Sequence, residues 1–529
     1  MAEYEELEGI IVRWAYGTFD LLLSQIVDAA QEEGKVWILV RPSTSDSNNI
    51  KNYLASRSIP LTNIEFLSIS TNAIWSRDYG PWTVYDITND SIGIVDFRYN
   101  RPARPLDDVV PVALASRWSL PLYQTVQMPD SLVHTGGNFM VDGFGTGFAS
   151  RLIMNENLHL TESLMDTLLA KYCGLTRLVR MNTLLYDEIH HIDMHMKLLD
   201  EETLLIGQYP VNVSDYATIE STVNNLKALT NCYGRPYRII RIPMPPSLSG
   251  GYPPSSNYYT YTNSVIINKT VLVPIYGFSL DQSALQIYRD AMPGYTVIGY
   301  DCNAIIPSLG AIHCITKEIG VREPVHIAHA PLGNTQDAGQ SYRISATIKV
   351  RSGVDSAFVH WRADSTQPFS RLHLVDSAGT FVGYIPHQAA PARVSYYIST
   401  KTGSGRAVNK PLVAPGGTYT FQIVDSSVTS VPDPETPGIF SLSQNYPNPF
   451  NPITIFGYSL PSPAKVEIKI YTVLGEELQT LFTGDQEAGS YTAVWDAGSF
   501  PSGVYFYRMS AVAKDGRLFV ETKKAVLLK

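Results

Sequence analysis

A strand, a helix and a second strand recur in turn along the first part of the chain, and this repetition constrains the fold more than any other feature. In the first copy, Gly9–Arg13 and Val36–Val40 are predicted strands on either side of a predicted helix at Phe19–Glu33. Leucine, isoleucine and alanine side chains gather on one face of that helix. This spacing predicts one strand-helix-strand module.

The pattern then returns with variations, to give about five α/β modules of roughly 60 residues each. The later strands, hairpins and helices are predicted at Gly93–Phe97, Val109–Arg117, Asn138–Gly143, Thr161–Tyr172, Met194–Lys197, Leu204–Gly207, Tyr216–Leu229, Tyr237–Ile242, Ser264–Asn268, Val271–Ile275, Asp281–Ala291 and Thr296–Gly299. Such a period predicts a closed array of repeats around a central channel. The candidate site residues lie at the starts of modules, so we expect them to meet there.

The second part of the chain has a different pattern of apolar and polar residues. From Ser341 onward apolar and polar residues alternate, as between Ile344 and Ile348, and turn residues separate the runs. This pattern predicts an immunoglobulin-like β-sandwich. A stretch rich in serine, threonine and proline precedes a second β-module, in which Val466 and Ile470 alternate with polar residues. The predicted divisions are an α/β domain (1–324), a β-sandwich (325–425), a linker (426–439) and a C-terminal β-domain (440–529).

The composition argues against several classes of function. The net charge of −9 is spread along the chain, which disfavours a nucleic-acid partner. The four cysteines show neither metal-site nor disulfide spacing, so we expect no metal. No run of about 18 apolar residues occurs, so no transmembrane segment is expected. No signal peptide follows Met1, so an exported protein would have lost its signal from this sequence.

Two acids, one histidine and one cysteine supply the groups needed to cut a nitrogen from a guanidinium. Its carbon is a poor electrophile, so an enzyme must hold the cationic plane with carboxylates and present a strong nucleophile. We assign Asp78 and Asp193 to the carboxylate clamp and Cys314, as a thiolate, to the attack. His191 lies two residues before Asp193, and on a strand both side chains would share a face. His191 would then protonate the departing ammonia and activate water.

Simpler interpretations of these residues stay open. A lone cysteine is usually a small core residue, and Asp78 after an arginine could belong to a surface ion pair. His313 adjoins Cys314, and on a strand the two would face opposite ways, which makes His313 a poor base. His190 is disfavoured beside His191, and the pair has no third ligand at metal spacing. The joint occurrence of these signals at module starts favours a catalytic site.

Several blocks of the sequence resemble the signatures of the guanidino-group-modifying superfamily. The blocks are Trp75–Pro81, Gly136–Asn138 with Asp142–Gly143, His191–Asp193, Asn263 and Gly310–Cys314. Agmatine deiminases and the bacterial secreted, Porphyromonas-type peptidylarginine deiminases share these blocks in this order. The resemblance implies a five-bladed pseudo-symmetric α/β propeller without a cofactor. It also implies catalytic roles for Cys314, His191, Asp78, Asp193 and Asn263, and substrate contacts for Trp75, Asp78 and Asp193.

A further segment, Asp96–Arg104, resembles the peptidylarginine branch, in which two arginines bind the α-carboxylate of a C-terminal arginine. Arginine binds a carboxylate well through its planar fork, whereas agmatine has no carboxylate. Arg101 and Arg104 are therefore predicted to bind substrate. The sequence departs from the family pattern by one residue, Ala103, which bears on Arg104. Alternatively, the arginines are solvated or pair with the acidic residues that follow.

The C-terminal region resembles the sorting domain of type IX secretion cargo. The matching segments are Gln444–Pro452, Tyr471–Gly475, Trp495–Asp496 and Ser502–Tyr507. The resemblance implies a diderm bacterium, the type IX secretion machinery as a partner, and a protein that is secreted or attached to the cell surface.

The sequence as a whole predicts a secreted peptidylarginine deiminase without a cofactor. Its substrates would be arginine-containing peptides or proteins, preferably with a C-terminal arginine, and its products citrulline and ammonia, formed through a covalent cysteine thiouronium intermediate. An alternative is a deiminase of agmatine or free arginine. A hypothesis of another class is a surface-displayed binding protein on a catalytically silent enzyme scaffold.

Overall fold

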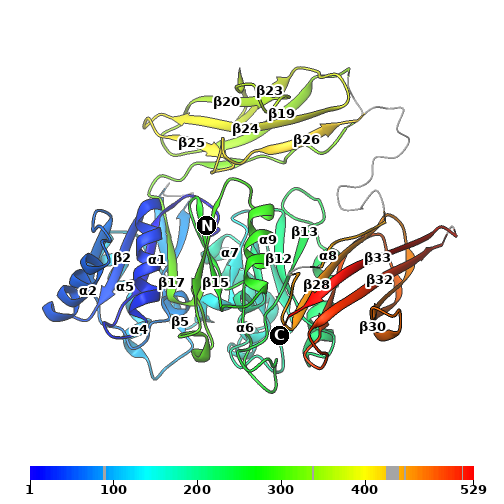
Figure 1. Cartoon of the computed structure of the whole chain (residues 1–529). Helices are drawn as coiled ribbons and strands as arrows, with labels where there is room; N and C mark the ends of the chain where they lie inside the picture. Colours follow the sequence, from blue (N-terminus) through cyan, green and yellow to red (C-terminus); the bar gives the residue numbers. More distant parts are fainter. Residues whose placement is uncertain (87–90, 336–338, 425–439, 446–447, 515, 529) are drawn as a thin grey trace. The chain divides into compact units, whose positions relative to one another are not determined.

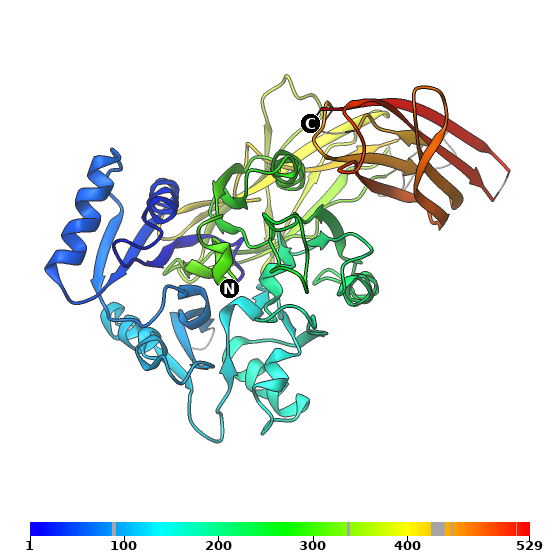
Figure 2. The same cartoon turned by 60° about the horizontal axis from the view of Figure 1, so that its bottom comes forward.

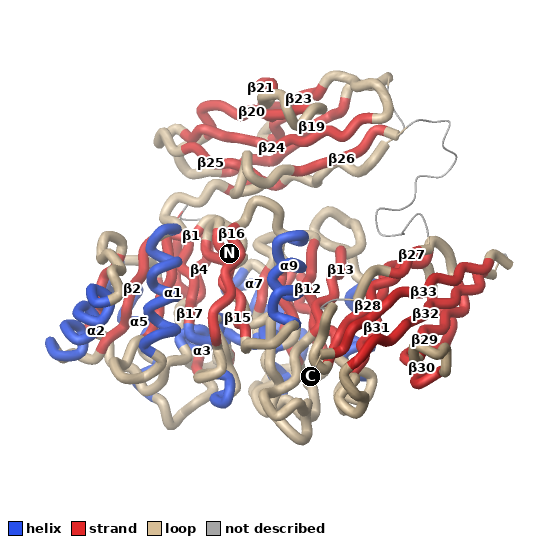
Figure 3. Tube along the Cα trace, in the orientation of Figure 1, coloured by secondary structure: helices blue, strands red, loops and turns tan. Residues whose placement is uncertain are grey.

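The chain forms two compact units, Met1–Ile423 and Val424–Lys529. The computed structural model describes residues 1–86, 91–335, 339–424, 440–445, 448–514 and 516–528 (Figure 1). The predicted linker at 426–439 lies outside these residues. In the described part of the chain, α-helices occur only up to Ala291, and strands form nearly all of the regular structure after Gly320 (Figure 3).

The helices belong to the first part of the first unit. The longer ones are α1 (Asp20–Glu33), α2 (Thr44–Ser56), α5 (Val110–Trp118), α7 (Glu162–Cys173), α8 (Tyr216–Lys227) and α9 (Leu280–Ala291). The single-turn helices are α3 (Ser76–Tyr79), α4 (Pro105–Asp108) and α6 (Leu152–Asn155). The 3₁₀ turns are η1 (Gly136–Asn138), η2 (Ile192–Met194), η3 (Ile306–Ser308) and η4 (His313–Ile315).

Five separate sheets hold the strands between Leu7 and Gly320. In hydrogen-bonded order they are β17 (Thr316–Gly320), β1 (Leu7–Arg13), β2 (Lys35–Val40) and β3 (Ile64–Ser68); β4 (Trp82–Asp86), β5 (Ser91–Tyr99) and β6 (Leu122–Thr125), with β7 (Val133–His134) also on β5; β8 (Met140–Val141), β9 (Thr146–Ser150) and β10 (Arg177–Met181); β11 (Met196–Leu198), β12 (Thr203–Gln208) and β13 (Arg238–Pro243); and β14 (Val265–Ile267), β15 (Thr270–Ile275) and β16 (Thr296–Asp301). In each sheet a central strand has an antiparallel neighbour on one side and a parallel neighbour on the other.

The predicted alternation of strands and helices is confirmed by these elements. The longer helices lie toward the outside of the five sheets, and the N-terminus lies near the middle of them (Figure 2). The last strand, β17, returns to pair with β1 of the first sheet. Among the described residues each of the five sheets is open, and no strand pairing joins one to the next. Closure into a five-bladed propeller therefore stays a prediction.

Local sequence explains the helix boundaries. The α7 helix begins after Thr161, whose side chain accepts a hydrogen bond from the Leu164 amide, and ends at Gly174. Gly174 has φ +67°, a left-handed conformation that glycine adopts without steric cost. By contrast, α2 buries only Ile50 and Leu54, so its apolar stripe is short.

The segments that carry the candidate site residues are turns that lead directly into strands. η1 precedes β8, η2 precedes β11, and η4 precedes β17. The prediction that His191 and Asp193 share the face of a strand is therefore wrong, since His191 is the extended residue before η2 and Asp193 lies within the turn. Cys314 likewise lies in η4, so the strand argument against His313 has no basis in the structure. These turns still start their modules, as expected.

The rest of the first unit consists of two sheets over one apolar core. They are β18 (His326–Ala328), β19 (Tyr342–Lys349), β23 (Thr380–Ile385) and β22 (Val375–Ser377); and β21 (Ser370–His373), β20 (Val354–Arg362), β24 (Ala392–Thr402) and β25 (Ala407–Lys410), with β26 (Tyr419–Ile423) also on β24. Ile344, Val359 and Ile398 are fully buried in this core. Its assignment to the immunoglobulin-like class stays a prediction.

The second unit also contains two sheets. They are β27 (Ser441–Leu442), β28 (Ile453–Leu460) and β31 (Gly489–Asp496); and β30 (Glu477–Gln486), β29 (Ala464–Tyr471), β32 (Gly503–Ala513) and β33 (Leu518–Leu527). Trp495, Phe456 and Tyr507 are fully buried between them. Across both units, none of the described helices is long and apolar enough to span a membrane.

Candidate active site

Cys314 lies in the η4 turn and is almost fully buried, with 3% of its surface exposed. The Nδ2 amide of Asn263 donates a hydrogen bond to its sulfur at 3.2 Å. The Oδ1 atom of Asn263 accepts from the backbone amides of Ala311 and His313, each at 3.1 Å. One buried asparagine therefore fixes both the thiol and the turn that carries it.

Asp193 also contacts the thiol. Its Oδ2 atom is 3.7 Å from the Cys314 sulfur and 2.7 Å from the Nδ1 atom of His313. Its Oδ1 atom is buried and has no hydrogen-bond partner among the described residues. One oxygen of this carboxylate is therefore held by the protein, and the other is free to accept from a bound ligand.

Gly137, in η1, is the point at which three candidate side chains converge. A Cβ atom built on Gly137 would lie 2.5 Å from His191 Nδ1, 3.1 Å from Asp193 Oδ2 and 3.1 Å from Asp78 Oδ1. The Gly137 amide also donates to Asp78 Oδ1 at 3.3 Å. A side chain at this position would force His191 to shift and would crowd both carboxylates, so the arrangement of the site favours glycine here.

His191 is buried beside Asp78, with its Nδ1 atom 3.7 Å from Asp78 Oδ1. Neither ring nitrogen of His191 has a hydrogen-bond partner within the described part of the chain. A buried polar group without a partner is costly, which is typical of a group that meets a ligand. Thus the structure brings Asp78, His191, Asp193, Asn263 and Cys314 together.

The electrostatics of the site oppose ionisation of the thiol. Burial, and then the charges of Asp193 and Asp78, raise the pKa of Cys314 well above its usual value. Burial also raises the pKa of Asp78. For Asp193, burial acts in the same direction, but the hydrogen bond and charge of His313 outweigh it and lower the pKa. A ligand that brings positive charge would relieve this excess of negative charge.

Trp75 and Cys314 flank the same glycine. A Cβ atom on Gly310 would lie 2.6 Å from the Trp75 ring and 3.1 Å from the Cys314 sulfur. The indole is thus close enough to the thiol to form a wall of the site. The role of Trp75 in substrate binding stays a prediction.

The two predicted substrate-binding arginines lie in the segment between β5 and α4. Arg101 is exposed, and its positive charge acts to lower the pKa of Asp78, although burial prevails and raises it. Arg104 is half-buried and donates to the Tyr99 hydroxyl at 3.4 Å. The backbone amide of Arg104 donates to the Arg101 carbonyl at 2.8 Å, so one turn carries both side chains.

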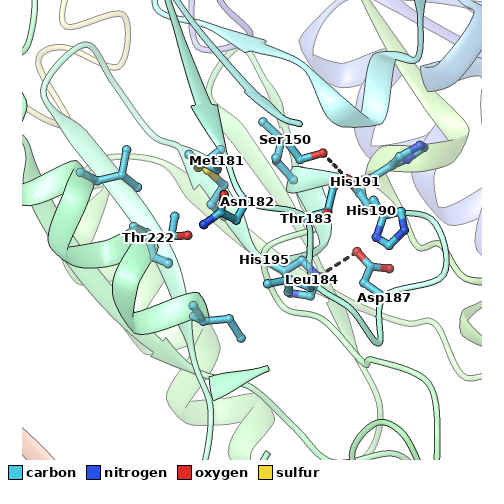
Figure 4. Close-up of a pocket in the computed structure, with 15 residues that line it drawn as sticks. Ser150, Met181, Asn182, Thr183, Leu184, Asp187, His190, His191, His195 and Thr222 are labelled. Atoms are coloured by element: carbon cyan, nitrogen blue, oxygen red, sulfur yellow. Dashed lines mark hydrogen bonds and ion pairs between the residues drawn. The ribbon is translucent and has the colours of Figure 1, made fainter. Parts of the chain in front are cut away.

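A mostly apolar pocket adjoins His191 on the side of His190 (Figure 4). The two imidazole rings point in different directions in this view. His190 has φ +56°, and its carbonyl accepts from the Ser150 hydroxyl at 2.7 Å. His195, also in the lining, bonds Asp187 through Nε2 at 3.1 Å. Of the five converging residues, only His191 lines this pocket.

Three residues next to the site were not predicted to belong to it. His313 is hydrogen-bonded to both Asp193 and Glu3. The buried Arg77 donates a hydrogen bond from Nε to the His313 carbonyl at 3.2 Å. Arg77 lies in the block Trp75–Pro81, but the sequence alone does not distinguish a buried arginine at this position from an exposed one. No group of three or more metal-ligating side chains is found among the described residues, and activity without a metal stays a prediction.

Comparison with known proteins gives matches for both ends of the chain. The family model described as Porphyromonas-type peptidyl-arginine deiminase matches residues 2–319, more than half of the chain. The model described as a secretion system C-terminal sorting domain matches residues 444–521.

Individual relatives match the first part of the chain. A Legionella pneumophila (strain Paris) protein, provisionally named agmatine deiminase, is 27% identical over 304 residues, which are 56% of this chain and 84% of the relative. Among solved structures, the C. jejuni agmatine deiminase has a TM-score of 0.51 and 24% identity, and covers 61% of this chain and 95% of its own. The Enterococcus faecalis agmatine deiminase has a TM-score of 0.53 and 20% identity, and the match covers 61% of this chain and 95% of that protein. The structural matches support the fold alone.

Proposed function

The chain belongs to the Porphyromonas-type peptidyl-arginine deiminase family, a family of guanidino-group deiminases, and from this premise we propose that it converts C-terminal arginine residues of peptides to citrulline and ammonia. The observation that carries the proposal is the convergence of Asp78, His191 and Asp193 on Gly137, beside the buried thiol of Cys314. The C-terminal sorting domain marks the protein as secreted or cell-surface, where such peptides would be met.

Substrate binding uses the two carboxylates. The planar guanidinium would lie against Asp78 and Asp193 and donate to their oxygens, including the unpartnered Oδ1 of Asp193. The cation neutralises the two charges that raise the pKa of the Cys314 thiol. Binding therefore favours the thiolate when its electrophile is present, whereas without a bound cation burial and the two carboxylates favour the protonated thiol.

The chemistry then proceeds in two halves. The Cys314 thiol transfers its proton to His191, and the sulfur bonds to the guanidinium carbon. His191 returns a proton to one nitrogen, the carbon–nitrogen bond breaks, and ammonia leaves a covalent thiouronium. In the second half, His191 takes a proton from water, the hydroxide adds to the same carbon, and the carbon–sulfur bond breaks as the added hydroxyl gives its proton to the departing sulfur. His191 then releases its proton to solvent. The products are a ureido group and the restored thiol.

Arg101 would select substrates that carry a carboxylate. Its charge acts on Asp78 less than that of His191 does, so we expect Arg101 to lie toward the end of the site away from the guanidinium, where the α-carboxylate of a bound arginine would be. An arginine fork binds a carboxylate through two parallel hydrogen bonds. Arg104 shares the same turn but is already bonded to Tyr99, so we assign the main contact to Arg101.

Deimination of agmatine is the second candidate, because the Legionella relative bears that name. Agmatine presents the same guanidinium to the same carboxylates. It lacks the α-carboxylate, so it would gain nothing from Arg101.

Ureido-product release from three substrates tests the proposal. The substrates are a peptide that ends in arginine, the same peptide with its carboxylate amidated, and agmatine. We expect turnover of the free-carboxylate peptide to exceed that of the other two. Preference for agmatine would establish the second candidate instead. Turnover of none of the three would point to a silent scaffold.

The variant Arg101→Ala adds a specificity test. We expect it to lower kcat/KM for the free-carboxylate peptide by about tenfold to a hundredfold, the typical contribution of hydrogen bonds between charged groups. Agmatine turnover should stay nearly unchanged. Arg117→Ala is the matched control, because Arg117 makes only an exposed pair with Glu65.

A further inference from the structure

His313 lies between two carboxylates. Its Nδ1 atom is 2.7 Å from Asp193 Oδ2, and its Nε2 atom is 2.7 Å from Glu3 Oε2. A neutral imidazole carries one N–H, whereas ionised carboxylate oxygens only accept. Both contacts are satisfied together when both ring nitrogens carry a proton, that is, when His313 is an imidazolium.

Both carboxylates are held in the ionised form. Burial raises the pKa of Glu3, but Lys197, His313 and Arg77 outweigh it and leave the pKa well below its usual value. The pKa of Asp193 is lowered in the same way by His313. Each of these carboxylates can therefore accept a hydrogen bond from one ring N–H of His313.

Glu3 is itself fixed on several sides. Its Oε1 atom accepts from Lys197 Nζ at 2.5 Å and from the Ile266 amide at 2.7 Å. Its Oε2 atom also faces Arg77 Nη2 at 3.4 Å. Lys197 lies on β11 and Ile266 on β14, so Glu3 ties two sheets to the η4 turn. The start of the chain lies near the middle of the sheets (Figure 2).

We propose that Glu3 is a positioning residue of the active site, which holds His313 as an imidazolium so that Asp193 keeps one oxygen fixed and presents the other to the substrate. This inference rests on the proposed function, because it assigns Asp193 to the guanidinium. Charge-assisted hydrogen bonds are roughly twice as strong as neutral ones. A charged His313 therefore restrains Asp193 more firmly than a neutral one would.

The other charged groups around this pair set the background for a pH measurement. Arg77 on α3 pairs with Glu318 on β17, and Lys317 on β17 bonds Glu318 at 2.8 Å. Asp78 and His191 face Asp193 across Gly137. Glu3 is the carboxylate that contacts the Nε2 side of His313. The substitution of Glu3 therefore changes the imidazolium directly, and the Arg77–Glu318 pair stays in place.

The variant Glu3→Gln tests the role, since it keeps the shape and removes the charge. Its amide can donate to Nε2, so a neutral His313 becomes compatible with both neighbours. We expect kcat/KM to fall by about tenfold or more for both the peptide and agmatine, because Asp193 loses a charge-assisted restraint. We also expect the pH profile of kcat/KM to change, because the carboxylate that contacts His313 Nε2 has lost its charge. Glu3→Asp should recover part of the loss.

The control is Glu8→Gln, in the same segment. Glu8 pairs with Lys35 at the surface, so its rates and pH profile should match those of the unsubstituted protein. Thermal unfolding of each variant separates the two roles. If Glu3→Gln lowers the melting temperature but leaves kcat/KM and the pH profile unchanged, Glu3 is structural only and the inference fails.

A substrate-independent measurement keeps this test apart from that of the proposed function. Protons in short imidazolium–carboxylate hydrogen bonds give far-downfield ¹H resonances, and His313→Gln identifies those of His313 in the full chain. We expect two such resonances in the unsubstituted protein and loss of the Nε2 one in Glu3→Gln. If the unsubstituted protein turns over no guanidinium, the proposed function fails. A single resonance that Glu3→Gln leaves unchanged overturns the inference alone.

Discussion

The side-chain amide of Asn263 donates to the Cys314 sulfur at 3.2 Å, while its carbonyl oxygen holds the backbone of the turn that carries the thiol. One residue thus combines a donor aimed at the nucleophile with an anchor for the η4 turn. A donor so placed stabilises a thiolate more than a thiol, because the anion is the stronger acceptor.

Asn263→Ala is expected to lower kcat by on the order of a hundredfold, as for the loss of one preorganised donor to a developing anion. Steady-state rates on the preferred substrate check this. Asn231→Ala is the matched control, since Asn231 is also buried and caps a turn through its Oδ1, far from the thiol in sequence. Equal losses of kcat in both variants would contradict a specific role for Asn263.

Gly137→Ala should abolish most of the activity without unfolding the protein. The added Cβ would lie 2.5 Å from His191 Nδ1, closer than real contacts allow, and 3.1 Å from an oxygen of Asp78, which is a tight contact. Displacement of catalytic groups by about 1 Å can cost a hundredfold in rate. The measurement is kcat/KM, with circular dichroism to show that the fold is retained.

Gly333→Ala provides the comparison, because a Cβ at that position meets nothing within 4 Å. It should keep the full rate. Retention of activity in Gly137→Ala would mean that the three side chains do not work as a unit around this point.

The β-sandwich is joined to the α/β part of the same unit by a largely buried ion pair. Lys410 Nζ lies 2.9 Å from Glu201 Oε1, and the two side chains are 20% and 6% exposed. Lys410→Met leaves the Glu201 charge without its cation, which costs about 3 kcal/mol for a buried carboxylate. We expect a lower thermal midpoint for the first unit.

Lys401→Met serves as the control for that prediction. Lys401 pairs with Asp355 at 3.5 Å, with both side chains more than half exposed, so its loss should change stability by well under about 1 kcal/mol. Equal midpoints for the two variants would show that the Lys410 pair adds no stability.

The sequence predicted most of the elements of the site, because chemically distinctive residues stand in short blocks. Cys314, His191, Asp193, Asp78 and Asn263 do converge in the structure. Their local geometry was predicted less well. Alternation rules treat each segment as a strand, but the site residues lie in 3₁₀ turns that precede the strands. In such a turn neighbouring side chains need not face opposite ways, and His313 was set aside for that reason.

Other features could not be found from the sequence at all. Glu3 contacts His313 across 310 positions, and it is one of several glutamates near the start of the chain, any of which could be solvated. The α2 helix was missed because only Ile50 and Leu54 are buried on it, too few apolar residues to reveal a helical period.

The charge balance of the site predicts how Cys314 reacts with small alkylating reagents. Burial and the charges of Asp193 and Asp78 raise the pKa of the thiol well above its usual value, so the unbound enzyme holds little thiolate near neutral pH. A neutral chloroacetamide should therefore label Cys314 slowly, at a rate that rises with pH. The cationic chloroacetamidine, of similar size, should label it faster by on the order of tenfold or more, because it neutralises the two carboxylates as it binds.

Asp193→Asn should reverse this preference. Removal of the Asp193 charge lowers the pKa of the Cys314 thiol. At a fixed pH below that pKa, the rate at which the neutral reagent labels Cys314 should therefore rise by on the order of tenfold. The cationic reagent no longer meets the Asp193 carboxylate, so its labelling rate should fall. Mass spectrometry of the labelled protein, with Cys314→Ala as the blank, measures both rates. If the ratio of the two rates is the same in Asp193→Asn as in the unsubstituted protein, the carboxylate does not control the thiol, and substrate charge is not what activates it.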